Sequence, residues 1–278
     1  MIRNRAMTRA ELDVALDWAA AEGWNPGLDD ADAFWTSDPG GFFVAEADGA
    51  PVAAISVVNH SDTFAFLGLY LCLPSHRGRG IGLGLWHHAL AHAGDRTVGL
   101  DGVEAQQANY EASGFARAGE TTRLVGRIEA APPVGLAMAR PPDVPALVSL
   151  EAAASGTPKP AYLRGWFTGA ATRTTFVLRR GGRIAGCATV RRCRTGAKVG
   201  PLIAGWMDDA LSLVAAATRW AGTDVVIDVP GRSLGFGPAL TSHGFAEGFR
   251  TVRMYRGPAP SAPSGGPILF GVASLELG

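Results

Sequence analysis

The feature that most constrains the fold of this chain is an internal repeat, in which landmarks of the first half recur about 130 residues later. The recurring pairs are Gly68 and Gly200 at an offset of 132, Asp101 and Asp228 at 127, and Gly114-Phe115 and Gly244-Phe245 at 130. Such a period is too long for a solenoid and suits a duplicated domain. A chain of 278 residues has room for two domains, each with its own core. We place the boundary near Glu129 and expect domains at 1–129 and 130–278.

Each copy contains the same order of predicted elements. In the first copy a β-hairpin over 41–57 precedes an apolar strand over 66–73, and 175–188 and 198–203 repeat this pattern. A helix, a strand ending in aspartate and a second helix follow, and the second helix stops at the Gly-Phe pair. Alternating strands and helices predict an α/β fold. Proline-rich segments at 131–133, 141–142 and 258–267 indicate linkers, and the apolar segment 268–275 predicts one more strand.

The composition favours small-molecule partners in a reducing compartment. The chain has 25 basic and 25 acidic residues, so it lacks the positive field that nucleic-acid binding requires. Its three cysteines, Cys72, Cys187 and Cys193, fit neither a disulfide framework nor the spacing of a metal site. No apolar run approaches the roughly 20 residues that cross a bilayer, and the N-terminus has no apolar signal-like core. We therefore expect a cytoplasmic protein that binds neither nucleic acid nor membrane.

The most distinctive segment of the first copy is the loop Arg77-Gly78-Arg79-Gly80-Ile81-Gly82, which follows a buried strand and opens a helix. A helix N-terminus offers unpaired amide donors, and glycines let a diphosphate approach the backbone. Arg77 and Arg79 add positive charge. The loop matches neither the dinucleotide fingerprint nor the P-loop, because no Lys-Ser/Thr follows the glycines and a hairpin precedes the strand. It is nevertheless a predicted anion site.

This loop resembles the pyrophosphate loop of the GNAT acetyltransferases, whose pattern is Arg/Gln-x-x-Gly-x-Gly/Ala. The segment Tyr110-Glu111-Ala112-Ser113-Gly114-Phe115 is similar to the family's Tyr-Glu-Lys-x-Gly-Phe motif, with Ala112 in place of lysine. The resemblance covers the whole first half, and the second half resembles the degenerate acetyltransferase domain of one tandem subgroup. It implies an α/β (α+β) fold with two GNAT-like domains, each a mixed central β-sheet flanked by helices.

The resemblance also implies acetyl-CoA as co-substrate. The backbone beside the loop would pair with the pantetheine arm, the loop would hold the diphosphate, and Asn109 would hydrogen-bond the arm. The residues implied in binding are Leu71, Cys72, Leu73, Arg77, Gly78, Arg79, Gly80, Ile81, Gly82 and Asn109. We expect no metal, because His87 and His88 have no ligand spacing with another His or Cys.

Direct attack of an amine on a thioester needs a general base, and the leaving thiolate needs an acid. Tyr110 matches the tyrosine that approaches the CoA sulfur in the family, so it is the predicted acid. Glu104, just past the end of a strand, is the candidate base, although a solvated carboxylate is the alternative. Glu46, His60 and Asp62 are further candidates for the base. Cys72 has no His/Asp partner pattern and is interpreted as a small core residue rather than a nucleophile.

The acceptor, a small-molecule amine, is expected to contact Trp24, Asn25 and Trp35, since the family varies this early segment. The alternative is a hydrophobic cluster that caps the sheet. The second copy has Asp208 and Asp209 in place of the glycine loop, so we expect it not to bind CoA in the usual manner. It would serve as scaffold, acceptor-site wall or dimer surface, and a homodimer is left open. A non-catalytic acyl-CoA sensor is the competing function, and Tyr110 argues against it.

Overall fold

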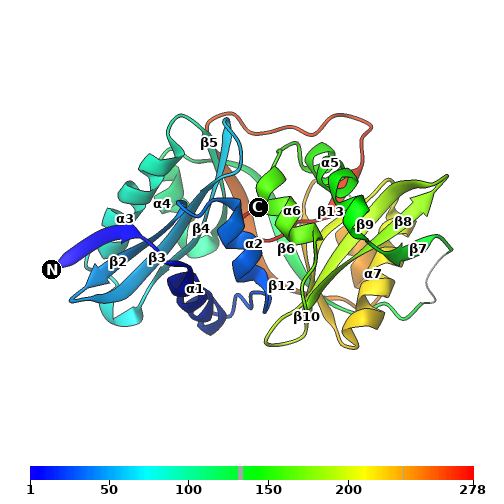
Figure 1. The fold of residues 1–278 in the computed structure, drawn as a ribbon, viewed down its shortest axis with the longest axis horizontal. Coiled ribbons are helices and arrows are strands. Elements are labelled where there is room, and N and C mark those ends of the chain that lie inside the picture. Colours follow the sequence, from blue (N-terminus) through cyan, green and yellow to red (C-terminus); the bar gives the residue numbers. More distant parts are fainter. Residues whose placement is uncertain (131–133, 234) are drawn as a thin grey trace.

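A computed structural model describes residues 1–130, 134–233 and 235–278 of the chain. The two halves lie side by side, and the chain end labelled C lies between them (Figure 1). The linker signal at Ala131-Pro132-Pro133 falls outside the described residues. The other two predicted linkers lie within them: 141–142 begins a 3₁₀ turn, and 258–267 connects the last two strands.

The strands form one continuous mixed sheet. In the first half they are β1 (Ile2–Ala6), β2 (Phe42–Ala47), β3 (Ala50–Asn59), β4 (Phe64–Cys72), β5 (Thr97–Val103) and β6 (Ala116–Gly126). In the second half they are β7 (Leu136–Met138), β8 (Arg173–Arg180), β9 (Arg183–Arg192), β10 (Ala197–Ala204), β11 (Val225–Pro230), β12 (Ala246–Arg256) and β13 (Ile268–Gly271).

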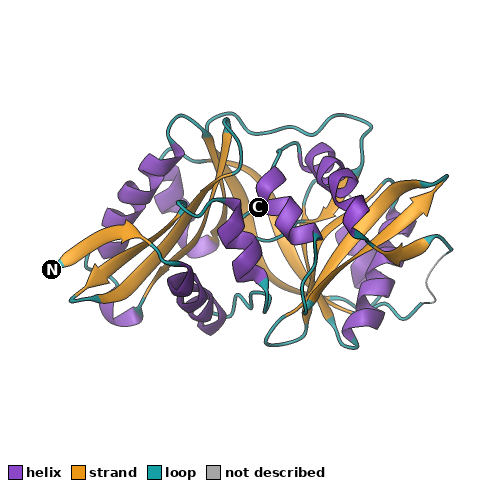
Figure 2. Cartoon of the chain, in the orientation of Figure 1, coloured by secondary structure: helices purple, strands orange, loops and turns teal. Residues whose placement is uncertain are grey.

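Helices cover both faces of this sheet (Figure 2). The α-helices are α1 (Arg9–Ala21), α2 (Asp30–Ser37), α3 (Ile81–Leu90), α4 (Gln107–Ala112), α5 (Val144–Ser155), α6 (Pro160–Phe167), α7 (Met207–Ala221) and α8 (Phe236–Ser242). The 3₁₀ turns are η1 (Pro74–His76), η2 (Ala91–Ala93), η3 (Glu104–Gln106) and η4 (Pro141–Asp143).

One hydrophobic core runs across both halves. It contains α1, α2, α5 and α6 on a common face of the sheet, whereas α3 and α7 pack in two separate cores. At its centre the Phe34 ring of α2 stacks on the Trp166 ring of α6, with centroids 6.1 Å apart and planes 7° apart. Because burying apolar area is the main driving force of folding, this shared core joins the halves into one unit.

The halves also exchange their last strands. The strand order is β1-β2-β3-β4-β5-β12-β6-β11-β10-β9-β8-β7, so β12 pairs with β5 of the first half and β6 pairs with β11 of the second. The two exchanged strands pair with each other at the centre. A boundary at residue 129 therefore divides the chain into two repeats. It does not divide the sheet in the same way, since β6 pairs within the second half and β12 pairs within the first.

Two matching ion pairs fasten the exchanged strands, and they explain the repeated aspartates. Asp101 on β5 accepts two hydrogen bonds from Arg253 on β12, at 2.9 and 2.7 Å. Asp228 on β11 accepts two from Arg123 on β6, at 2.7 and 2.9 Å. Both aspartate side chains are buried. Bidentate arginine–carboxylate pairs are strong and geometrically specific, so each pair fixes the register of a borrowed strand.

The segment 268–278 runs between the two halves. It begins with β13, which pairs antiparallel with β10, and it ends beside the first half. There the imidazole Nε2 of His60 lies 2.8 Å from the carbonyl oxygen of Leu277, and the backbone N–H of Leu277 donates to Ser274 Oγ at 3.0 Å. We call residues 272–278 the C-terminal tail.

His60 should make the protein sensitive to mild acid. Burial lowers its pKa from 6.5 to about 3, and the positive charge of Lys159 adds to this effect. Because the folded pKa lies below the unfolded one, the neutral imidazole contributes full stability above pH 6.5, and this contribution is lost as the pH falls toward 3. The slope contributed by one such group is up to about 1.4 kcal/mol per pH unit.

We expect urea unfolding of a His60→Phe variant to depend less on pH between 6.5 and 5 than unfolding of the wild type. His243→Gln, at an exposed histidine, is the matched control and should keep the wild-type slope. Equal slopes for wild type and His60→Phe would contradict this assignment.

None of the helices in the described part of the chain combines the length and hydropathy needed to cross a bilayer.

Candidate active site

The site begins where β4 separates from β5. The two strands pair in parallel only between 64–66 and 97–99, and they diverge beyond this point. Leu69 has a φ of +48°, and the register of β4 against β3 shifts nearby. Such a β-bulge bends a strand and commonly lies beside a functional site. Here it accompanies the gap between two parallel strands, whose pairing ends at residues 66 and 99.

The glycine loop lies at one end of this gap. Gly78 and Gly80 have φ values of +71° and +75°, in the left-handed region that glycine adopts without strain, and Gly80 is the N-cap of α3. A Cβ atom at Gly82 would lie 2.7 Å from the Tyr70 hydroxyl, so a larger residue there would displace the end of the Tyr70 side chain. The first turn of α3 therefore presents its free N–H groups next to an open glycine loop, which is the local geometry of an anion site.

A groove connects this loop to the gap. It is lined by Glu22, Trp24, Tyr70, Leu71, Cys72, His76, Arg77, Gly78, Gly80, Ile81, Gly82, Leu83, Val103, Ala105 and Gln106. Arg77 Nε donates to the carbonyl oxygen of Cys72 at 2.8 Å, and its Nη2 lies 2.5 Å from Glu22. Arg77 is half exposed at the mouth of the groove, where its guanidinium is paired with Glu22. Burial raises the pKa of the Cys72 thiol, which makes it a poor nucleophile.

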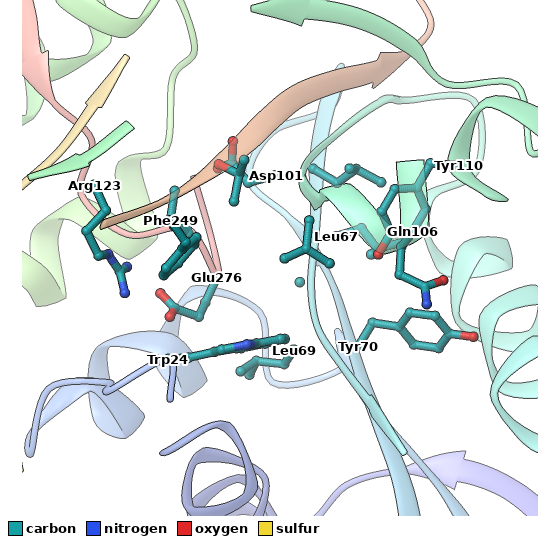
Figure 3. A pocket seen from close by; sticks show the side chains of 15 residues that line it. Trp24, Leu67, Leu69, Tyr70, Asp101, Gln106, Tyr110, Arg123, Phe249 and Glu276 are labelled. Atoms are coloured by element: carbon teal, nitrogen blue, oxygen red, sulfur yellow. The ribbon is translucent and has the colours of Figure 1, made fainter. Parts of the chain in front are cut away.

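A deeper cavity continues from the groove and shares Trp24, Tyr70, Val103 and Gln106 with it. Its full lining is Trp24, Leu67, Gly68, Leu69, Tyr70, Leu100, Asp101, Val103, Gln106, Tyr110, Arg123, Phe249, Thr251, Leu275 and Glu276. Figure 3 shows Trp24, Phe249 and Glu276 on one side of Leu67, and Tyr70, Gln106 and Tyr110 on the other. The walls thus come from β4, β5, both exchanged strands and the C-terminal tail.

Tyr110 on α4, the predicted acid, lines the deeper cavity. Its ring stacks on Trp86 of α3, with centroids 5.4 Å apart and planes 17° apart, and it also packs against Phe115. Burial raises the pKa of Tyr110, and the neighbouring Tyr70 adds to the shift. The phenol is therefore protonated at neutral pH and can donate a hydrogen bond or a proton to a group in the cavity.

Most predicted binding residues lie in the groove, but several predicted residues do not line either cavity. Leu73 and Arg79 flank the groove rather than line it. Glu104 is exposed on η3, and Asn109 is exposed and donates to Gln106 Oε1 at 2.9 Å. Asn25 is bound to Thr195 in the second half, and Trp35 stacks on Phe42 in the core. We therefore do not carry Glu104, Asn109, Asn25 or Trp35 into the proposal below.

Sequence reasoning missed the lining residues that come from the two exchanged strands and the C-terminal tail. Arg123 lies on β6, Phe249 on β12 and Glu276 on the C-terminal tail. Their neighbours along the chain carry no motif, so no local signal could have placed them in this cavity. Gln106 was within reach of the sequence, because it lies one turn before Tyr110.

The corresponding gap in the second half is filled by the chain itself. β10 pairs in parallel with β11 only over 197–199, and β13 then pairs with β10 at 202–204. A Cβ atom at Gly200 would lie 1.9 Å from the carbonyl oxygen of Val272, and one at the equivalent Gly68 would lie 1.9 Å from that of Glu276, so this contact is common to both halves and the β13 pairing is what differs. At the start of α7, Trp206 replaces the glycine N-cap, and Asp209 forms an ion pair with Arg180 at 2.5 Å. Both the gap and the helix start therefore differ from those of the first half.

Comparison with known proteins gives the family. The model of the acetyltransferase (GNAT) family matches residues 9–119, and that of an acetyltransferase (GNAT) domain matches residues 147–266. The holothin acyltransferase of Pseudoalteromonas sp. (strain SANK 73390) is 38% identical over 274 residues, which cover 96% of this chain and 92% of that protein. The chain belongs to the GNAT acetyltransferases. It is a tandem GNAT acyltransferase, as the internal repeat indicated.

Solved structures support the tandem GNAT fold. A protein from Pyrococcus horikoshii superposes with a TM-score of 0.84 at 16% identity, over 100% of this chain and 96% of that one. The tandem GNAT protein from the clavulanic acid biosynthesis pathway gives a TM-score of 0.63 at 18% identity, over 93% and 99%. The predicted α/β architecture of two GNAT domains with mixed sheets is confirmed.

Proposed function

We propose that this tandem GNAT protein transfers an acetyl group from acetyl-CoA to the amine of a small molecule, by direct attack within a ternary complex. The observation that carries the proposal is the continuous path from the Gly78–Gly82 loop, through the gap beside β4, to the cavity that holds Tyr110. A diphosphate, an extended arm and a thioester follow one another in the same order in acyl-CoA. The order of the loop, the gap and the cavity therefore matches the order of the diphosphate, the arm and the thioester in acyl-CoA.

In this proposal the donor binds mainly through backbone groups. The free N–H groups at the start of α3 hold the diphosphate, and Arg77 adds charge at the groove mouth. The separated edge of β4 at Leu71 and Cys72 pairs with the amides of the pantetheine arm. Small acyl groups suit the far end, because Leu67, Leu69 and Leu100 surround it closely.

Tyr110 is the proposed acid. When the amine nitrogen attacks the thioester carbon, the C–S bond breaks and negative charge develops on sulfur. A neutral phenol at that end of the cavity stabilises this charge and gives its proton to the thiolate. Its burial keeps the proton on Tyr110 until the thiolate forms.

The acceptor enters from the side of Trp24 and Phe249 in this proposal. These two aromatic side chains and the leucines make the wall largely apolar, and Glu276 and Arg123 supply the polar groups. Such a lining suits an amine carried on a flat apolar body. The relative's name states that holothin is acylated, so holothin is a rational first acceptor to test.

Only the first half is proposed to bind the donor. In the second half β13 occupies the gap that the arm would need, and the helix start lacks a glycine loop. The second half is proposed to complete the acceptor cavity, through the exchanged strands and the tail.

The experiment that tests this function is thiol release from acetyl-CoA in the presence of single amines, including holothin, aniline and benzylamine. We expect release that depends on both the amine and the enzyme, with the N-acetyl product visible by mass spectrometry. A protein that binds CoA but releases no thiol with any amine would instead be an acyl-CoA sensor.

A further inference from the structure

We propose that Glu276, on the C-terminal tail, is the carboxylate that receives the proton of the acceptor amine. This inference rests on the proposed function, because it names the group that completes the same reaction. It also implies that the catalytic cavity is built from both ends of the chain.

Glu276 is a buried carboxylate that lines the cavity and has an oxygen left unpartnered in the described part of the chain. Only 3% of the residue is exposed, and it lines the same cavity as Tyr110. Among the residues that the structure describes, its Oε2 atom has no hydrogen-bond partner. Figure 3 shows the carboxylate between Trp24 and Phe249, on the acceptor side. Buried carboxylate oxygens normally accept hydrogen bonds, so an unsatisfied one in a cavity wall points to a donor that arrives with a ligand.

Two cations near Glu276 make their hydrogen bonds to other groups. Lys198 donates to the carbonyl oxygen of Trp24 at 2.7 Å, and Arg123 is engaged by both oxygens of Asp228. Burial lowers the pKa of Lys198, and the charge of Glu276 opposes this shift most among its neighbours. Burial opposes the charge on Arg123, but its partner Asp228 raises the pKa of Arg123 and Glu276 adds to this effect. Both cations therefore lie close enough to Glu276 to interact with its carboxylate electrostatically while they are bound elsewhere.

The other acid of the cavity is not available. Asp101 is buried and accepts both donors of Arg253, so its oxygens are taken by a structural pair. Glu104, the candidate from the sequence, is exposed and lines neither cavity. Among the described acidic residues, Glu276 alone combines burial, cavity lining and an unpartnered oxygen.

The tail is held so that Glu276 keeps its position. A Cβ atom at Gly68 on β4 would lie 1.9 Å from the carbonyl oxygen of Glu276, so the tail backbone touches the strand directly. The next residue, Leu277, is fixed by His60 and Ser274. The contacts of Glu276 and Leu277 hold the tail backbone against the strand that diverges at the proposed donor site.

The proposed step balances as follows. The amine nitrogen forms a bond to the thioester carbon, its N–H proton passes to Glu276, and the C–S bond breaks. The sulfur takes the proton of Tyr110, and the proton on Glu276 later returns to the phenolate through solvent. The acceptor class is a primary amine on a flat apolar body, flanked by Trp24 and Phe249.

The test compares Glu276→Gln with wild type in the thiol-release assay, using the panel amine with the highest turnover. General bases typically contribute 10²–10⁴-fold, so we expect kcat/KM for the amine to fall by about that factor. The Kd for acetyl-CoA, measured by calorimetry, should stay within about twofold, because Glu276 lies on the acceptor side. Glu111→Gln is the matched control, since this exposed carboxylate on α4 pairs with Arg117 outside the cavity.

A second variant distinguishes the loss of the base from misfolding of the protein. Glu276→Ala leaves space for a small anion, so added formate should restore part of the lost turnover, whereas formate should not change the wild type. Wild-type kcat/KM in Glu276→Gln, or a loss in Glu104→Gln instead, would overturn the role of Glu276. No turnover of any amine by the wild type would reject the proposed function and this inference with it.

Discussion

Replacing Tyr110 by phenylalanine should lower kcat by about 10²–10⁴-fold, the range that general acid–base groups contribute. The variant keeps the ring that stacks on Trp86, so α3 and α4 should pack as in the wild type. It removes only the hydroxyl, and the departing thiolate then lacks its proton donor. The measurement is steady-state thiol release with saturating acetyl-CoA.

Tyr110→Phe should lower the rate of acetyl transfer without changing the affinity for acetyl-CoA. The Kd for acetyl-CoA should be unchanged, because the diphosphate is held at the other end of the groove. Tyr255→Phe is the control, since this tyrosine lies on β12 outside both cavities of the site. An unchanged kcat in Tyr110→Phe would remove the acid from the mechanism and would favour a leaving thiolate protonated by water.

Replacing Arg253 by methionine should destabilise the protein by about 3–5 kcal/mol, the usual cost of removing one partner of a buried ion pair. The Asp101 carboxylate would remain buried without its two donors. This ion pair connects β12 to β5 of the first half. Its removal should therefore weaken the pairing of the exchanged strand. Equilibrium urea unfolding measures the loss of stability.

Two further variants make this result specific. Arg250→Met removes an exposed arginine from the same strand, and its effect should stay within about 0.5 kcal/mol. Adding Asp101→Leu to Arg253→Met should recover much of the lost stability, because no buried charge is left unpaired. Equal effects of Arg253→Met and Arg250→Met would show that the exchange does not depend on this pair.

The sequence predicted the parts of the site that depend on local pattern. A glycine loop after a buried strand was recognisable because its residue types are needed for the turn at Gly78 and Gly80 and for the contact at Gly82. The repeated aspartates were visible too, and they marked equivalent strands. The duplicated architecture followed from these landmarks.

The rest could not be predicted, because it depends on partners distant in the chain. The elements predicted for each copy stop at its Gly-Phe pair, and no local pattern shows that the following strands, β6 and β12, each join the other half. The tail likewise gives a strand signal, while the place of Glu276 depends on contacts with Gly68 and His60 more than 200 positions away. Glu104 was favoured as base because it follows a strand end, but η3 leaves it exposed to solvent.

We propose that the first half of this chain binds acyl-CoA at the start of α3 and that the second half does not bind it. Titration calorimetry with acetyl-CoA tests it most directly, on wild type and on a variant with Arg77 and Arg79 both changed to glutamate. We predict one binding site per chain in the wild type and strongly weakened binding in the variant. Two sites per chain, no binding, or equal affinity of the two proteins would contradict the account.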